Sequence, residues 1–244
     1  MIALFTDFGL AGPYLGQVKA VLHDRAPAVP VVDLLADAPA YRIASAAHLL
    51  AALIAPFPAG TVFLCVVDPG VGTDEREPVY YRVDGRWFVG PGNGVFDVVA
   101  KRGRFIEAWC VDWRPQSLSR SFHGRDLFAP VAAKLAAGES VAATRLELDL
   151  GALSSLPDDL HEVIYVDGFG NAMSGIRSTA LDDGDCVSVA GRMLKFAPTF
   201  GAAVESEAFW YRNSLGLVEV SVNRGSAAAL LGLRVGDSVV AEVD

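Results

Sequence analysis

The stretch FLCVVDPGVGTDER, residues 63–76, carries the clearest information about the fold. An apolar run leads into Asp68, and a Pro-Gly-Val-Gly turn and a charged tail follow it. A short apolar run bounded by turn residues predicts a buried strand over 62–67. Because ligands bind beyond the carboxyl ends of strands in open parallel sheets, this pattern places a candidate site at Asp68.

The first half of the chain alternates short apolar runs with stretches of helical periodicity. Alternation of this kind is typical of a mostly parallel sheet with helices on both faces. We therefore predict an α/β N-terminal domain over residues 1–145. Strands are expected at 2–5, 29–34, 62–67, 86–89 and 105–111, and helices at 13–25, 43–54, 94–101 and 124–137.

The second half of the chain changes to short strand-like segments separated by turn residues. Residues 146–160 are interpreted as a linker, and residues 161–244 as a smaller all-β domain, a small barrel or sandwich. Its strands are expected at 162–166, 186–189, 193–196, 208–212, 217–222 and 238–243.

Composition and charge narrow the range of partners. The 244 residues carry a formal net charge of −9, which argues against nucleic acid and anionic membranes as partners. The three cysteines form no C-x-x-C pair and are interpreted as core thiols of a reducing compartment. No apolar run reaches the roughly 18 residues of a membrane span, and no signal-peptide pattern is present. We expect a cytoplasmic protein.

Three apolar strands end beside an aspartate, at Asp7, Asp33 and Asp68. For Asp33 a local turn or capping role is favoured, whereas Asp7 and Asp68 are each followed by a glycine-containing turn. Neither a phosphate loop of the Walker type nor a dinucleotide fingerprint fits the glycine spacing. Carboxylates repel phosphate, but they suit a ribose diol or a cation. The pattern therefore predicts a neutral or cationic ligand that carries a ribose.

A second cluster is SFHGRDLFAP, residues 121–130. Either His123 meets Asp68 as a base with its orienting acid, or Arg125 and Asp126 pair locally and His123 is incidental. Asp7, Asp68, His123 and Asp126 could also hold a metal, but no metal-ligand spacing appears and none is expected. By their residues alone, VDGFGN (166–171) and RNSLG (212–216) are interpreted as structural turns.

Six motifs together resemble one known family, in order and over nearly the whole chain. They are TDFG (6–9), VVDPGVGT (66–73), VGPGNG (89–94), FHGRD (122–126), FGN (169–171) and NS-LG (213–216). The set resembles the S-adenosylmethionine hydroxide adenosyltransferases, relatives of the fluorinase and chlorinase. The resemblance implies an α/β domain, a C-terminal β-barrel, and a homotrimer whose sites form where the N-domain of one subunit meets the C-domain of the next. It also implies that no cofactor or metal is required.

The resemblance further implies roles for individual residues. Asp7 would hold the ribose hydroxyls, and Asp167 and Ser214 the amino and carboxylate ends of the methionine part. Asn171 would bond adenine, assisted by backbone near Asn223 and Arg224. The remaining substrate-binding residues implied are Tyr41 and Phe122, as apolar walls, and Asn93.

The water-activating set implied by the resemblance is Asp68, an arginine and His123. Members of the family commonly read Thr-x-Arg-Arg after the glycines, whereas this chain reads Thr73-Asp74-Glu75-Arg76. Glu75 therefore occupies the position of the first arginine, and Arg76 remains as the arginine of the water-activating set. The glycine loop 89–94 also departs from the family pattern, because Gly92 stands before Asn93 where Asp or Asn is more common.

The activity implied is hydrolysis of S-adenosylmethionine to adenosine and methionine, by attack of activated water at the ribose C5′ atom. Halide transfer to the same carbon is an alternative, but a general base serves water and has no use with a halide. A nucleoside hydrolase needs several aspartates around calcium, and TDFGLAG (6–12) offers one. A non-catalytic protein that binds S-adenosylmethionine or adenosine is a third alternative.

Overall fold

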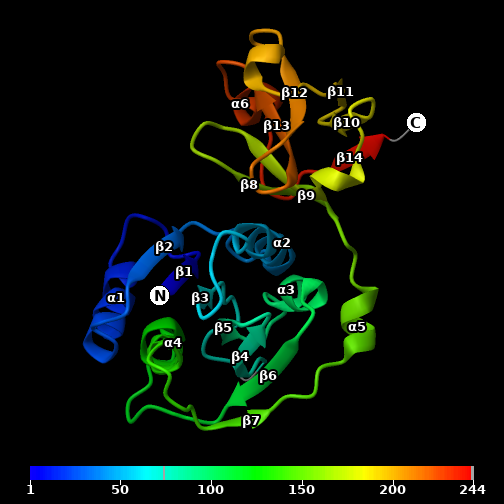
Figure 1. Cartoon of the computed structure of the whole chain (residues 1–244). Helices are drawn as coiled ribbons and strands as arrows, with labels where there is room; N and C mark the ends of the chain where they lie inside the picture. Colours follow the sequence, from blue (N-terminus) through cyan, green and yellow to red (C-terminus); the bar gives the residue numbers. More distant parts are fainter. Residues whose placement is uncertain (74, 243–244) are drawn as a thin grey trace. The chain divides into compact units, whose positions relative to one another are not determined.

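The computed structural model describes residues 1–73 and 75–242 (Figure 1). The chain divides into two compact units. The first comprises residues 1–50 and 54–156, and the second comprises residues 51–53 and the chain from 157 onward. Within the described residues, no helix is long and apolar enough to cross a membrane.

The first unit is built on one seven-stranded sheet. In spatial order the strands are β2 (Val31–Leu35), β1 (Ile2–Thr6), β3 (Val62–Val66), β5 (Arg86–Pro91), β4 (Pro78–Val83), β6 (Ile106–Val111) and β7 (Ala143–Arg145). The first four run parallel to one another, and only β4 and β7 oppose the common direction. The prediction of a mostly parallel sheet is therefore confirmed.

The sequence analysis missed β4 and β7. β4 and β5 form an antiparallel hairpin, and both residues of its turn, Asp84 and Gly85, have positive φ. An Asp-Gly pair between two strands is a strong hairpin signal, because a type I′ turn requires that backbone conformation. The signal was present in the sequence, but the charged residues before Pro78 obscured the start of the strand.

Helices cover the sheet of the first unit (Figure 1). Residues of α1 and α4 pack with Leu4, Leu64 and Val89 in one core cluster. On alternate strand positions, Phe63 and Phe88 stack at 5.0 Å between ring centroids. The bounds are α1 (Tyr14–Arg25), α2 (Ile43–Leu53), α3 (Asp97–Arg102), α4 (Ala129–Ala136), which follows a π-helical turn (Gly124–Phe128), and α5 (Leu150–Ser155).

β1 and β3 are interior strands of the sheet, and their burial explains their unbroken apolar runs. Every residue of both strands is buried, so neither alternates polar and apolar residues. Burying one large apolar side chain of this kind stabilises a fold by about 1.5–3 kcal/mol. α5 lies within the segment interpreted as a linker, so that segment carries structure of its own.

Among the described residues from 157 onward, the second unit is all-β apart from α6 (Ala227–Leu231) and two short 3₁₀ turns. The strand pairings within its sheets are antiparallel. They form two sheets, and isolated bridges from Glu162 to Ser238 and from Phe196 to Trp210 link the edges of those sheets. The sheets are β12 (Ala208–Arg212), β13 (Leu217–Val222), β9 (Ala172–Arg177) and β8 (Leu160–Val166), then β11 (Arg192–Leu194), β10 (Cys186–Val189) and β14 (Val239–Glu242). β9 was not predicted, and residue 243 of the strand expected at 238–243 lies outside the described residues.

Candidate functional site

Two of the three strand-end aspartates meet at one edge of the first sheet. Asp7 follows β1 and Asp68 follows the neighbouring parallel strand β3, so both lie at carboxyl ends. The backbone N–H of Asp7 donates to the carbonyl of Val66 at 3.2 Å, which fixes this register at the strand ends. Asp33 lies within β2 and pairs with Lys19 at 2.6 Å, so it is neither the turn residue nor the cap that the sequence favoured.

A glycine brings the loop after Asp68 against the segment that carries His123. Gly72 has φ +81°, and a Cβ placed on it would lie 2.3 Å from the carbonyl oxygen of Arg120. No other residue could sit there without moving one of the two segments. This close approach joins the 69–73 loop to residues 120–123, which are distant in sequence.

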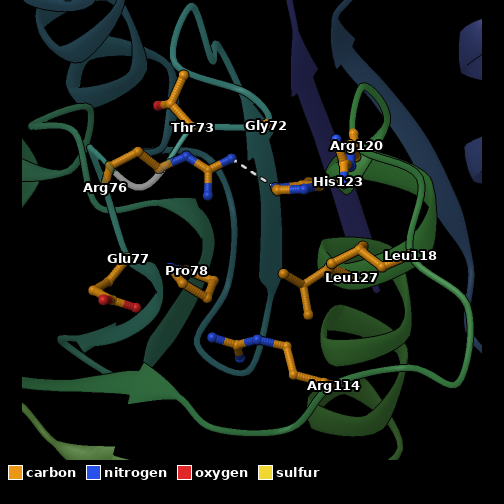
Figure 2. Close-up of a pocket in the computed structure, with 10 residues that line it drawn as sticks. All are labelled: Gly72, Thr73, Arg76, Glu77, Pro78, Arg114, Leu118, Arg120, His123 and Leu127. Carbon is orange, nitrogen blue, oxygen red and sulfur yellow. Dashed lines mark hydrogen bonds between the residues drawn. The ribbon is translucent and has the colours of Figure 1, made fainter.

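Asp68, Arg76 and His123 form one buried network. Arg76 Nε donates to Asp68 Oδ1 at 2.9 Å, and its Nη2 contacts Asp68 Oδ2. The same Nη2 lies 3.0 Å from His123 Nδ1 (Figure 2). The side chains of Arg76 and Asp68 are only 5% and 4% exposed. A bidentate pair between an arginine and a carboxylate fixes geometry as well as charge.

This arrangement revises one detail of the sequence-based hypothesis. Asp68 and His123 do come together, since both line one small cavity. The hydrogen bond that orients the imidazole, however, comes from Arg76, which stands between the two. A guanidinium can only donate, so Nδ1 of His123 must accept and the neutral ring carries its proton on Nε2.

The surroundings shift the protonation of the site groups. Burial and then the Arg76 charge lower the pKa of His123 from its ordinary value, and the Asp68 carboxylate partly offsets this. Burial raises the pKa of Asp7, with a smaller contribution from the nearby charge of Asp68. Both shifts have desolvation as their first cause, which is typical of functional sites.

The arginine question raised by the sequence has a geometric answer. Arg76 occupies the position between Asp68 and His123. Glu75 is exposed, and its backbone N–H donates to Thr73 Oγ1 at 3.3 Å. The neighbouring pair of Arg125 and Asp126 does bond locally, at 2.6 Å between Arg125 Nε and Asp126 Oδ1. That local pair exists beside the network and does not replace it.

A cavity of about 630 Å³ opens beside the two aspartates, and we call it the acidic pocket. Its lining includes four residues that the sequence analysis assigned to one site: Asp7, Tyr41, Asp68 and Phe122. Tyr41 is 81% exposed and has φ +62°, a conformation uncommon outside glycine. A smaller cavity of about 60 Å³ is lined by Asp7, Asp68, Phe122 and also His123.

Two aromatic residues of the acidic pocket were missed by the sequence analysis. Phe8 packs edge-on against Phe122 at 5.7 Å, and Tyr14 packs edge-on against Phe122 at 5.4 Å. Phe8 directly follows Asp7 within the TDFG motif, so its position beside a predicted site residue indicated that it lies near the site. Tyr14 begins α1 and gave no signal that separated it from an ordinary helix residue.

Asn93 lies near this edge, but among the described residues it has a positioning role. Its Nδ2 donates to the carbonyl of Val67 at 2.9 Å, and its Oδ1 accepts from the N–H of Val95 at 3.3 Å. Asn93 thereby ties the loop after β5 to the end of β3. It does not line either cavity beside Asp7 and Asp68.

In the second unit, Asp167, Asn171 and Arg224 line a cavity of about 650 Å³ together with Phe169 and Tyr211. The Asp167 carboxylate accepts from the backbone N–H groups of Phe169 and Asn171, each at 2.9 Å. It also accepts from Asn171 Nδ2 at 2.9 Å. The turn interpretation is therefore correct, and the same turn also lines a cavity.

Ser214 and Asn223 do not line that cavity. Ser214 is exposed in the turn between β12 and β13, and Asn223 Nδ2 donates to the carbonyl of Ala203 at 3.1 Å. A buried carboxylate that the sequence did not reveal lies close by: Glu219, 1% exposed, accepts from Tyr211 Oη at 2.5 Å. Burial raises the pKa of Glu219.

The four residues considered as metal ligands do not form a metal site in the part of the chain that the structure describes. No group of three His, Cys, Asp or Glu residues there has the arrangement to hold an ion. Arg76 and Arg125 instead neutralise Asp68 and Asp126.

Comparison with known proteins identifies relatives over both units. Residues 2–145 match the family model of the SAM hydroxide adenosyltransferase N-terminal domain, and residues 161–240 match that of the C-terminal domain. An (R)-S-adenosyl-L-methionine hydrolase from Thermus thermophilus is 39% identical, covering 96% of each chain. The crystal structure of an uncharacterized conserved protein from Thermotoga maritima has a TM-score of 0.87 and 31% identity, covering 100% of both chains. A fluorinase from Nocardia brasiliensis is more distant, at 25% identity over 100% of this chain and 97% of its own.

Proposed function

The chain belongs to the SAM hydroxide adenosyltransferase family, and from that premise we propose that it is an enzyme that hydrolyses S-adenosylmethionine to adenosine and methionine. The observation that carries this proposal is the buried network of Asp68, Arg76 and His123 beside the acidic pocket. It combines a group able to take a proton with a cavity suited to a cation.

The acidic pocket receives the cationic substrate. Asp7 provides a carboxylate that attracts the sulfonium and accepts the two ribose hydroxyls. Phe122 and Tyr41 bound the pocket with apolar surface, which excludes water from the reacting carbon.

The reaction moves one proton and one electron pair. A water oxygen forms a bond to C5′ while the bond from C5′ to sulfur breaks, and the electron pair of that bond stays on the sulfur of methionine. His123 takes the water proton at Nδ1, so its hydrogen bond from Arg76 gives way at that step. The Asp68 carboxylate then faces a new imidazolium, and the Arg76 charge favours later release of the proton. General-base catalysis of this kind contributes typically about 10²–10⁴ in rate.

Residues of the second unit complete the substrate site. Asp167 takes the amino end of the methionine part and Ser214 its carboxylate. Asn171 bonds the adenine, with backbone near Asn223 and Arg224. We propose that these groups act in a homotrimer, in which the second unit of one subunit serves the first unit of another. No cofactor is needed, because the sulfonium is already a good leaving group.

The location that we propose is the cytoplasm. The thiols of Cys65, Cys110 and Cys186 are free, which suits a reducing compartment. Cys65 lies fully buried in β3, where it packs as a small core residue.

Product analysis in ¹⁸O-labelled water tests the reaction. We expect adenosine and methionine in equal amounts, with one ¹⁸O atom in the 5′-hydroxyl of adenosine. Adenine release would instead indicate a nucleoside hydrolase, and 5′-halogenated adenosine in halide buffers would indicate a halogenase. Binding of S-adenosylmethionine without formation of any product would indicate a non-catalytic binding protein. His123→Gln should lower turnover by about 10²-fold or more, since a glutamine cannot serve as the base.

A further inference from the structure

The first unit contains a further cavity, of about 520 Å³, whose lining is rich in arginine (Figure 2). Arg76, Arg114 and Arg120 line it, and Glu77 is the one acid among the described residues of its lining. We call it the arginine pocket. The whole chain carries a formal net charge of −9, so an excess of cations around one cavity runs against its composition. Such a cavity attracts anions.

Arg76 directs part of its guanidinium into this pocket. Its Nε and Nη2 are engaged by Asp68 and His123. Figure 2 shows the remaining terminal nitrogen directed into the cavity. Because the bidentate pair with Asp68 holds the guanidinium almost fully buried, the direction of that N–H is fixed before any ligand arrives.

Arg114 is held in place at the same cavity by its backbone neighbours. Its Nη1 donates to the carbonyl of Trp113 at 3.0 Å and also contacts the carbonyl of Val111. Among the described residues, these bonds leave the Nε and Nη2 edge of the guanidinium for another acceptor. Arg120 is exposed, and its backbone packs against Gly72. Guanidinium forks match the oxygens of phosphate better than flexible ammonium groups do, and those of Arg76 and Arg114 are already held in place.

The catalytic network separates this pocket from the acidic pocket. Asp68 lines the acidic pocket but not the arginine pocket, whereas Arg76 lines only the arginine pocket of the two. His123 lines the arginine pocket and also the small cavity that it shares with Asp7. An anion could therefore reach Arg76 and His123 without entering the space of the substrate.

We propose that the arginine pocket binds a small oxyanion of the phosphate class, through Arg76, Arg114 and Arg120, at a site distinct from the acidic pocket. The ligand is either free inorganic phosphate or the phosphate group of a phosphomonoester. Both present the same tetrahedral oxygens to the three guanidinium groups.

A bound oxyanion acts on His123 through charge. The charged groups that face His123 are Asp68, Arg76, Arg114 and Asp126, with Arg120 and Glu77 on the shared cavity. Arg76 and Arg114 both lower the pKa of His123, so an anion that neutralises them raises it. Near that pKa, more of the His123 rings are then protonated and cannot accept a proton from water. This consequence rests on the proposed function, whereas the binding itself does not.

Calorimetric titration of the full chain with inorganic phosphate, at constant ionic strength, tests the site. We expect a Kd of about 1 mM or tighter, and a loss of about tenfold or more in Arg114→Gln and in Arg120→Gln. Arg104→Gln, an exposed arginine outside the pocket, is the matched control and should keep the wild-type Kd. No binding at about 10 mM, or an equal loss in the control, overturns the proposal. Because Arg120 acts from the cavity rim, its variant remains informative if Arg114→Gln unfolds.

Steady-state kinetics tests the coupling to His123. Phosphate should lower kcat without raising KM for S-adenosylmethionine, and the inhibition should fade as the pH rises above the pKa of His123. Competition with S-adenosylmethionine would place the anion in the acidic pocket and would overturn the separate site. A glycerol phosphate titration distinguishes the ligand sources: tighter binding than inorganic phosphate assigns a phosphomonoester, and weaker binding assigns the free ion. If phosphate binds but no hydrolysis occurs, the proposed function fails while the site stands.

Discussion

The two units use the same kind of sequence signal, an aspartate beside a glycine, for different physical ends. Asp68 is 4% exposed and pairs with a guanidinium, which in turn bonds an imidazole 47 positions further along the chain. Asp167 bonds backbone and side-chain N–H groups within four residues of itself. The comparison teaches that a turn aspartate becomes part of a long-range side-chain network when a buried arginine joins it to a residue far along the chain.

Arg76→Gln tests the buried network directly and should have the largest effect. A glutamine leaves Asp68 buried without its counter-charge and His123 without its orienting donor. We expect turnover to fall by roughly 10²–10³-fold, the scale seen when a preorganised donor is removed. Stability should also fall, by about 3–5 kcal/mol, because one partner of a buried ion pair is lost.

The matched control for Arg76→Gln is Arg82→Gln. Arg82 lies within β4 and, like Arg76, is paired with an acid, in this case Glu107. Its side chain, however, is 50% exposed. Exposed pairs contribute only about 0–1 kcal/mol, so kinetics and thermal unfolding should stay near wild type. Equal losses in both variants would remove the distinction that the comparison draws.

Gly72→Ala tests whether the network depends on the close approach of two distant loops. The new Cβ meets the carbonyl of Arg120, so the loops must separate and Arg76 must move relative to His123. We expect the free energy of unfolding to fall by about 2–4 kcal/mol, because the backbone strain of alanine at positive φ adds to the clash. Turnover should fall by about tenfold or more, since small displacements of catalytic groups are costly.

Gly138→Ala is the control for this variant. Gly138 has φ +77°, and among the described residues no atom lies within 4 Å of a Cβ placed on it. The substitution therefore brings the backbone strain without the clash. Urea unfolding and kcat should show a stability loss of only about 1 kcal/mol and unchanged turnover. Turnover that falls equally in the two variants would mean that the loop contact does not position the network.

Asp167→Asn probes the second unit and should separate binding from chemistry. The amide keeps the shape of the turn but loses the charge that is proposed to hold the amino end of the substrate. We expect KM for S-adenosylmethionine to rise by about tenfold, equal to about 1.4 kcal/mol, with kcat little changed.

Asp237→Asn is the corresponding control, since Asp237 closes a turn by accepting from the N–H of Arg234 at 2.7 Å and does not line the cavity beside Asp167. Its KM should match wild type. A fall in kcat rather than a rise in KM for Asp167→Asn would assign that carboxylate to the chemistry.

Glu75→Arg should have the smallest effect. Arg76 already bonds both Asp68 and His123, and Glu75 is exposed, so a second arginine finds no vacant place in the network. We expect kcat within about twofold of wild type, which corresponds to less than about 0.5 kcal/mol. A larger rise would indicate that the arginine at position 75 displaces Arg76, and a large loss would give Glu75 a role of its own.

The sequence by itself determined the elements whose signals are local. Uninterrupted apolar runs identified β1 and β3, turn residues separated most strands of the second unit, and the strand-end positions of Asp7 and Asp68 predicted a shared edge. It missed β4, β7 and β9, where charged or small residues interrupted the pattern. The resemblance in six motifs supplied the roles that spacing alone left open.

Only the tertiary structure decided which partners meet. No local rule predicts that Arg76 stands between Asp68 and His123, that Gly72 presses on Arg120, or that Arg114 reaches the same cavity. These contacts bring together segments that are separated in the chain. They form because a buried charge is costly unless an opposite charge or a hydrogen-bond partner lies beside it. Propensity and periodicity describe neighbours along the chain, whereas the pairing of buried charges is settled by the packing of the whole unit.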